Sequence, residues 1–268
     1  MLPAIKAAVK AGEKIMEIYK TDFDVAYKDD ASPLTVADQT AHRIITDILS
    51  AEWPDVPILS EEGEQLSLEE RESWKQFWLV DPLDGTKEFI KKNDEFTVNI
   101  ALIDNQKPIF GVVYAPALDV LYVGDMQQGA VRLDKAASRL AGMNRIEDCF
   151  TGGKSLPYIK EAADRVRVVA SRSHMSDETE QFVQELKHTY QRVEVVSAGS
   201  SLKLCLIAAG EADFYPRYAP TMEWDTGAGQ AVVEAAGGSV TVASDNAPLV
   251  YNKEHLQNPW FLASRKKG

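Results

Sequence analysis

The chain reads WLVDPLDGT from Trp78 to Thr86, and this stretch says the most about its fold and function. The apolar residues 77–80 are typical of a buried strand. Because Asp81 precedes a proline, its backbone is expected to stay extended at the strand end. Asp84-Gly85 then favours a turn, and a helical pattern follows from Thr86 to Lys92. We therefore expect two carboxylates beside the free N–H groups of a helix start, where a cation and a phosphate can bind side by side.

Three further acidic segments lie elsewhere in the chain. The pair Glu61-Glu62 follows a short apolar run, and Asp38 and Asp225 stand at the start of the helical stretches 39–49 and 226–236. Each segment has an ordinary structural explanation: a solvated loop for the glutamates, helix capping for both aspartates and turn formation for the Asp-x-x-Asp pair. The functional alternative is that these carboxylates converge on a hard cation such as Mg²⁺, which prefers oxygen ligands.

The combination of DPLDGT at 81–86 with WDTGAG at 224–229 resembles the lithium-sensitive, Mg²⁺-dependent phosphatase family. This family includes inositol monophosphatase, fructose 1,6-bisphosphatase and the 3'(2'),5'-bisphosphate nucleotidases. The nucleotidases are the most similar members in three further stretches: 79–90, 96–103 and 111–116. The resemblance covers most of the chain. It is weakest from Met126 to Val166 and from Lys187 to Val193, where we expect loops or insertions.

The resemblance implies Mg²⁺ as the cofactor and a set of ligands on this chain: Glu61, Asp81, Asp84, Asp225 and the backbone carbonyl of Leu83. It implies three catalytic residues: Asp38, Glu61 and Thr86. Of these, Thr86 would orient the attacking water together with Glu61 or Asp38, and Asp38 would help to hold a further metal ion or its water. Two cations about 4 Å apart can clamp the attacking and departing oxygens, so no covalent phosphoenzyme is needed.

Substrate-binding residues are implied in both halves of the chain: Glu61, Leu83, Asp84, Gly85, Thr86, His174, Ser200, Lys203, Arg217 and Asp225. Those of the second half follow the expected strands 166–170, 193–196 and 212–215, and strand ends border the usual ligand crevice of an α/β sheet. Lys203 and Arg217 are cations that can meet the second phosphate of an adenosine bisphosphate. Without the family context, the same residues are a loop histidine, a helix N-cap serine and two surface cations.

The leading hypothesis for function is a phosphatase that removes the 3'-phosphate of adenosine 3',5'-bisphosphate, with its sulfated precursor as a second substrate. This activity would support sulfate assimilation. The first alternative is an inositol or sugar phosphatase with the same metal core. The second is a catalytically silent nucleotide-binding sensor, which the full set of acidic residues disfavours.

We expect an α/β protein with an α+β N-terminal half (1–160) and an α/β C-terminal half (161–268), and the resemblance implies a layered αβαβα sandwich. Strands are expected around Ile58 and Leu79 and at 98–103, 110–114, 120–123, 166–170, 193–196 and 212–215. They should form an antiparallel or mixed sheet in the first half, followed by α/β alternation. Helices are expected near the N-terminus and at 39–49, 177–187, 201–209 and 226–236. The acidic run 66–72 is expected to be a solvated helix.

Composition excludes several classes of protein. A chain of 268 residues with 45% hydrophobic content can bury a substantial core, and a net charge of −12 argues against a polynucleotide partner. Cys149 and Cys205 are too few for a disulfide scaffold, so we expect a reducing cytoplasm. The N-terminal stretch predicts an amphipathic helix without a membrane span, so that at most peripheral contact with the inner membrane is expected. A monomer or homodimer is expected, with three solvent-facing histidines: His42, His188 and His255.

Overall fold

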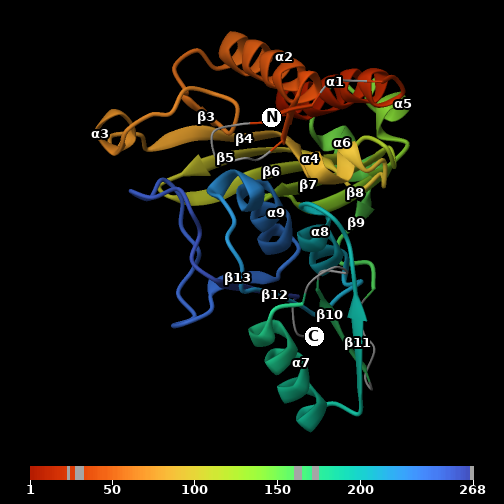
Figure 1. Cartoon of the computed structure of the whole chain (residues 1–268). Coiled ribbons are helices and arrows are strands. Elements are labelled where there is room, and N and C mark those ends of the chain that lie inside the picture. Colours follow the sequence, from red (N-terminus) through yellow and green to blue (C-terminus); the bar gives the residue numbers. More distant parts are fainter. Residues whose placement is uncertain (23–24, 28–32, 160–164, 171–174, 266–268) are drawn as a thin grey trace.

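The computed structural model describes residues 1–22, 25–27, 33–159, 165–170 and 175–265, which form five layers (Figure 1). Helices α1 (Leu2–Tyr19) and α2 (Val36–Glu52) cover the outer face of a seven-stranded sheet. Helices α8 (Leu202–Ala209) and α9 (Glu223–Ala235) lie between this sheet and a five-stranded sheet, whose far face is covered by α7 (Asp177–Thr189). The expected αβαβα sandwich is thereby confirmed.

The larger sheet is mixed, as predicted. Its strands, in spatial order, are β3 (Ile58–Ser60), β4 (Gln76–Asp84), β5 (Thr97–Asp104), β6 (Lys107–Ala115), β7 (Val120–Asp125), β8 (Gly129–Asp134) and β9 (Lys154–Ser155). Only β3 and β4 pair in parallel. Along β4, Trp78 and Val80 face the helices α1 and α2, whereas Phe77 and Leu79 face the middle layer. A strand buried on both faces accounts for the unbroken apolar run in the sequence.

The smaller sheet combines parallel and antiparallel pairs. Its strands, in spatial order, are β11 (Arg192–Val196), β10 (Arg165–Val169), β12 (Phe214–Arg217), β14 (Phe261–Ser264) and β13 (Ser239–Val242). The three strands expected from the sequence pair in parallel, and the last two, which the sequence did not predict, pair antiparallel. The α/β alternation of the second half is therefore confirmed.

Several short elements complete the chain: β1 (Val25–Tyr27), β2 (Pro33–Thr35), α3 (Leu68–Arg71), α4 (Thr86–Ile90), α5 (Ala136–Leu140) and α6 (Glu147–Gly152). The expectation of loops from Met126 to Val166 is wrong for much of this segment, because it contains β8, α5, α6 and β9. Val131 and Leu133 alternate toward the outer core there and add a strand to the sheet. The segment Lys187 to Val193 holds the end of α7 and the start of β11.

One prediction about side-chain exposure is wrong, and a second, the solvated helix in the acidic run 66–72, holds for its glutamates but not for Arg71. His42 is half-buried and not solvent-facing: its Nδ1 lies 2.9 Å from Ser60 Oγ, and burial lowers its pKa. Arg71, at the end of the acidic run, is 2% exposed and donates to Asn252 Oδ1 and to the carbonyl of Lys253. The acidic run is therefore tied to the fold through this arginine. His188 and His255 are exposed as expected.

The apolar core has one part on each side of the larger sheet. The outer part contains Ile5 and Ile15 of α1, whose apolar face is thus occupied within the fold. The inner part combines residues of the larger sheet with α8 and α9, and therefore draws on both halves of the chain. The division at residue 160 stays a prediction. In the described part of the chain, every helix is too short or too polar to cross a membrane.

Close packing of α9 on the larger sheet depends on Gly111 and Gly124, which are paired across β6 and β7. A Cβ atom at Gly111 would lie 2.3 Å from the Ala228 carbonyl oxygen, and one at Gly124 would lie 2.5 Å from Val232 Cα. Because both obstacles are backbone atoms, we expect Gly111→Ala to lower the free energy of unfolding by about 3 kcal/mol, measured by urea titration.

The matched control for this prediction is Gly142→Ala. Gly142 is exposed, and a Cβ atom there would lie 4.0 Å from the nearest atom outside its own neighbours, the Arg139 carbonyl oxygen. We expect its free energy of unfolding to change by less than about 0.5 kcal/mol. Equal urea midpoints for both variants would show that α9 can move away from the sheet at little cost.

Candidate active site

Three aspartates converge at the end of β4 and the start of α9. Carboxylate oxygens of Asp81, Asp84 and Asp225 all lie within 4.8 Å of one another. Asp81 is 1% exposed; its Oδ1 accepts a hydrogen bond from the Leu83 N–H at 3.1 Å, whereas its Oδ2 has no partner among the described residues. We call these three residues the acidic cluster.

The backbone of β4 explains how two carboxylates from one strand reach the same place. The pairing with β5 shifts register between Asp81 and Asp84, an irregularity that bends a strand and changes the direction of its side chains. Gly85 follows with φ +89°, in the left-handed region that glycine adopts most easily. Helix α4 then begins at Thr86, as the sequence predicted.

Asp38 and Asp225 were both expected to cap a helix, but neither is the N-cap residue itself. Met222 is the N-cap of α9, and Asp225 lies three residues into the helix, where its Oδ2 accepts from the Met222 N–H at 2.8 Å. Asp38 stands at the equivalent position of α2, with its Oδ2 accepting from the Thr35 N–H at 2.8 Å. In each aspartate, one carboxylate oxygen thus caps the helix, and the other oxygen can bind a different partner.

That second oxygen is used differently by Asp38. Its Oδ1 accepts a hydrogen bond from the Thr86 hydroxyl at 3.1 Å, and this hydroxyl also lies 3.3 Å from the Leu83 carbonyl oxygen. Asp38 is 2% exposed, and burial raises its pKa. The predicted catalytic residues Asp38 and Thr86 are therefore in direct contact.

Negative charge in the acidic cluster is poorly compensated. Burial, and then the charges of Glu61, Asp84 and Asp225, raise the pKa of Asp81. Burial and the Asp84 charge raise the pKa of Asp225 to about 8. Carboxylates that repel one another in this way are stabilised by a bound cation. The unpartnered Asp81 oxygen and the convergent oxygens thus fit a hard divalent ion.

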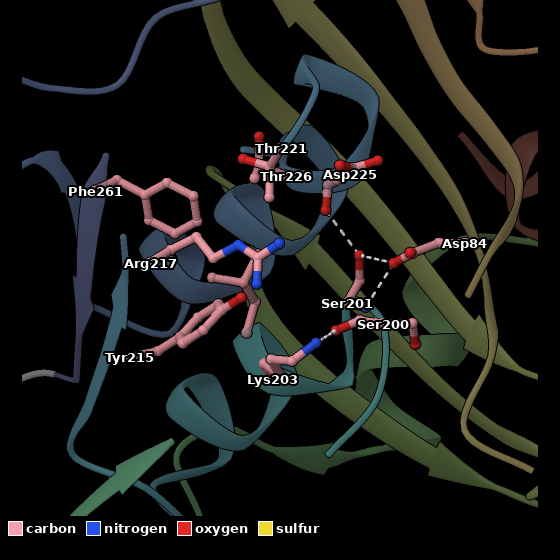
Figure 2. Close-up of a pocket in the computed structure, with 11 residues that line it drawn as sticks. Asp84, Ser200, Ser201, Lys203, Tyr215, Arg217, Thr221, Asp225, Thr226 and Phe261 are labelled. Carbon is pink, nitrogen blue, oxygen red and sulfur yellow. Dashed lines mark hydrogen bonds between the residues drawn. The ribbon is translucent and has the colours of Figure 1, made fainter. Parts of the chain in front are cut away.

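A polar pocket adjoins the acidic cluster. Figure 2 shows Lys203 of α8 and Arg217 of β12 on the side of the pocket opposite Asp84 and Asp225. Lys203 Nζ donates to the Ser200 carbonyl at 3.0 Å, and Arg217 Nη2 donates to the Pro220 carbonyl at 3.0 Å. The pocket therefore presents two cations and two carboxylates to the same space.

Most of the predicted site residues lie in this region. The exception is His174, which lies outside the residues that the structure describes. Sequence reasoning missed Ser201, the N-cap of α8, and Asn99 of β5, which both contact Asp84. A polar asparagine within the apolar run 97–103 was the available signal for Asn99, whereas Ser201 was overlooked beside Ser200.

Because the pKa of Asp225 is raised by burial, the stability of the protein without a bound cation should fall as the pH rises. The ordinary pKa of Asp225 is 3.8, and in the fold it is about 8. Between these values the folded protein keeps a proton that the unfolded chain has released, so a rise in pH favours unfolding. We expect the melting temperature in a chelator to decrease from about pH 5 to about pH 8. A melting temperature that stays constant or rises over this window would contradict the arrangement.

Comparisons with known proteins are consistent with one another. The sequence profile described as the Inositol monophosphatase family matches residues 1–265. The 3'(2'),5'-bisphosphate nucleotidase CysQ of Shigella flexneri is 45% identical over 260 residues, which are 96% of each chain. The crystal structure of CysQ from Bacteroides thetaiotaomicron has a TM-score of 0.89 and 46% identity, and the match covers 99% of this chain and 97% of that one. The structure of an inositol monophosphatase from Anabaena has a TM-score of 0.68 and 25% identity, and the match covers 98% of this chain and 88% of that one.

Proposed function

Since the chain belongs to the inositol monophosphatase family, we propose that it is a Mg²⁺-dependent 3'(2'),5'-bisphosphate nucleotidase. Its substrate is adenosine 3',5'-bisphosphate, which it hydrolyses to AMP and phosphate, and the sulfated precursor is a second substrate. This reaction recycles a by-product of sulfate assimilation. The proposal is supported by the nucleotidases that share 45% identity over nearly the whole chain.

The observation that carries this proposal is the pair of cations across from the acidic cluster. A bisphosphate has two anionic groups, and the pocket offers a separate partner for each. One phosphate binds at the acidic cluster once its charge is neutralised, and the other meets Lys203 and Arg217 through charge-assisted hydrogen bonds. A substrate with a single phosphate would leave Lys203 and Arg217 without an anionic partner.

The residues that would hold Mg²⁺ are those of the acidic cluster, with Glu61 and the Leu83 carbonyl. When bound, the ion polarises the phosphoryl group and lowers the pKa of water. Thr86 orients the attacking water, because its hydroxyl proton is already directed to Asp38 Oδ1 and its oxygen is left to accept. The proton lost by the water passes toward Asp38, whose raised pKa suits a general base. As the P–O bond breaks, the ribose oxygen takes a proton from a second water molecule, and the proton held by Asp38 returns to solvent.

Several finer properties belong to the same proposal. Inhibition by lithium follows from the family resemblance. A cytoplasmic location agrees with the free, buried thiols of Cys149 and Cys205. Peripheral contact with a membrane and the choice between monomer and homodimer stay predictions.

The test is phosphate release in Mg²⁺ from adenosine 3',5'-bisphosphate, inositol 1-phosphate and fructose 1,6-bisphosphate, measured side by side. Each substrate is assayed with a chelator control and a lithium titration. We expect a strong preference for the nucleotide, lost in chelator and inhibited by lithium. Preference for the inositol or sugar phosphate would overturn the substrate assignment. Nucleotide binding without any phosphate release would identify the silent sensor instead.

A further inference from the structure

Ser201 links the acidic cluster to the second half of the chain. Its backbone N–H donates to Asp84 Oδ2 at 2.6 Å, and its hydroxyl lies 2.8 Å from the same oxygen. The hydroxyl also lies 2.8 Å from the carbonyl oxygen of Asp225 (Figure 2). With 3% of its surface exposed, Ser201 is thus buried between the two chain segments that supply the cluster.

Asn99 occupies one acceptor position of the Ser201 hydroxyl. The Asn99 side chain is 1% exposed, and its Nδ2 donates to Ser201 Oγ at 2.9 Å. A hydroxyl has one proton to donate and two lone pairs to accept with. Because Asn99 fills an acceptor position, the serine proton is left to reach Asp84 or the Asp225 carbonyl. The same amide makes a longer contact of 3.4 Å with Asp84 Oδ2.

The two carboxylate oxygens of Asp84 have different surroundings. Oδ2 accepts from the Ser201 N–H at 2.6 Å and from the Asn99 amide at 3.4 Å, and it lies 2.8 Å from the Ser201 hydroxyl oxygen. Oδ1 has no hydrogen-bond donor among the residues that the structure describes. Since the polar groups of Ser201 and Asn99 converge on one oxygen, rotation of the carboxylate about its terminal bond would break these contacts together. The orientation of Asp84 is therefore fixed by Ser201 and Asn99 before any ligand binds.

We propose that Ser201 is a positioning residue that holds Asp84 with one oxygen bound by the protein and the other open to Mg²⁺. This inference rests on the proposed function. Groups that orient a metal-binding side chain affect ion affinity about 10- to 100-fold when removed. Because the Ser201 N–H remains in a Ser201→Ala variant, its loss of affinity should lie near the lower value.

The test measures Mg²⁺ binding to the substrate-free protein by titration calorimetry. We expect Ser201→Ala to raise the Kd for Mg²⁺ about tenfold and to lower kcat at limiting Mg²⁺. The KM for the nucleotide at saturating Mg²⁺ should stay close to the wild-type value. As a control, Ser239→Ala removes an exposed serine hydroxyl that bonds to Ser264, and should keep wild-type affinity.

A double-mutant cycle separates positioning from general damage. If Asn99 acts through the Ser201 hydroxyl, Asn99→Ala and Ser201→Ala should be non-additive, so that the double variant binds Mg²⁺ about as weakly as the weaker single one. Wild-type Mg²⁺ affinity in Ser201→Ala, or full additivity in the cycle, would overturn the inference. Wild-type protein that binds Mg²⁺ but prefers inositol phosphate would overturn only the proposed substrate, and a weakened Ser201→Ala variant would still support the positioning role.

Discussion

Asp81→Asn is expected to abolish phosphate release and at the same time to stabilise the metal-free protein. Asp81 is buried, and its pKa is raised by burial and by three neighbouring carboxylates. The amide is isosteric but neutral, so it removes repulsion from the folded state. It also removes a proposed Mg²⁺ ligand, whose loss should cost about 4 kcal/mol of transition-state stabilisation, or about a 1000-fold decrease in kcat. A substitution that lowers activity but raises stability indicates that the carboxylate is needed for function and not for folding.

The measurement is kcat in saturating Mg²⁺ together with the melting temperature in a chelator. Asp213→Asn is the matched control, because Asp213 is 5% exposed but paired with Arg167 and Arg265. We expect this control to lose stability and to keep kcat. An Asp81→Asn protein that melts earlier in chelator than the wild type would mean that Asp81 stabilises the fold and is not strained within it.

The second large effect is a change of substrate preference in Lys203→Met. Methionine keeps an unbranched apolar stem and removes the ammonium group, which lies in the pocket near Arg217. A hydrogen bond to a charged group contributes about 1.5 to 3 kcal/mol, so kcat/KM for adenosine 3',5'-bisphosphate should fall about 100-fold. Hydrolysis of inositol 1-phosphate, which has no second phosphate, should change by less than about twofold.

Both substrates are assayed on the same preparation, so loss of folded protein cannot imitate the result. The control is Lys187→Met, which removes a lysine from the last turn of α7 on the exposed surface. A parallel fall in both activities would contradict a role for Lys203 in binding the second phosphate. It would instead indicate that the substitution in α8 disturbs the acidic cluster.

Sequence predicted the parts of the fold and the site that depend on local signals. The apolar run 77–80, the Asp-Pro and Asp-Gly pairs and the helix start at Thr86 each have a short-range cause, and the strand and helix lie where they were expected. The convergence of Asp81, Asp84 and Asp225 was anticipated from the family motifs. Their role as ligands remains a proposal.

Features that depend on distant pairing were not predicted. Strands β13 and β14 have four residues each, and they exist because β14 pairs with β12 on one side and with β13 on the other. The contacts of Ser201 and Asn99 with Asp84 join β4, β5 and α8, which the sequence separates by 15 and 117 residues. No local sequence pattern predicts these contacts, because they arise from the packing of α8 against the larger sheet.

The shared position of Asp38 and Asp225, three residues beyond the N-cap, limits how the chain can vary in length. Each carboxylate is aimed by the first turn of its helix, since one oxygen is held by the N–H of the capping residue. Adding or deleting one residue in that turn would rotate the aspartate by about 100° around the helix axis. The beginnings of α2 and α9 are therefore tied to a fixed number of residues, and the acidic side chains place no such constraint on the C-terminal ends of these helices.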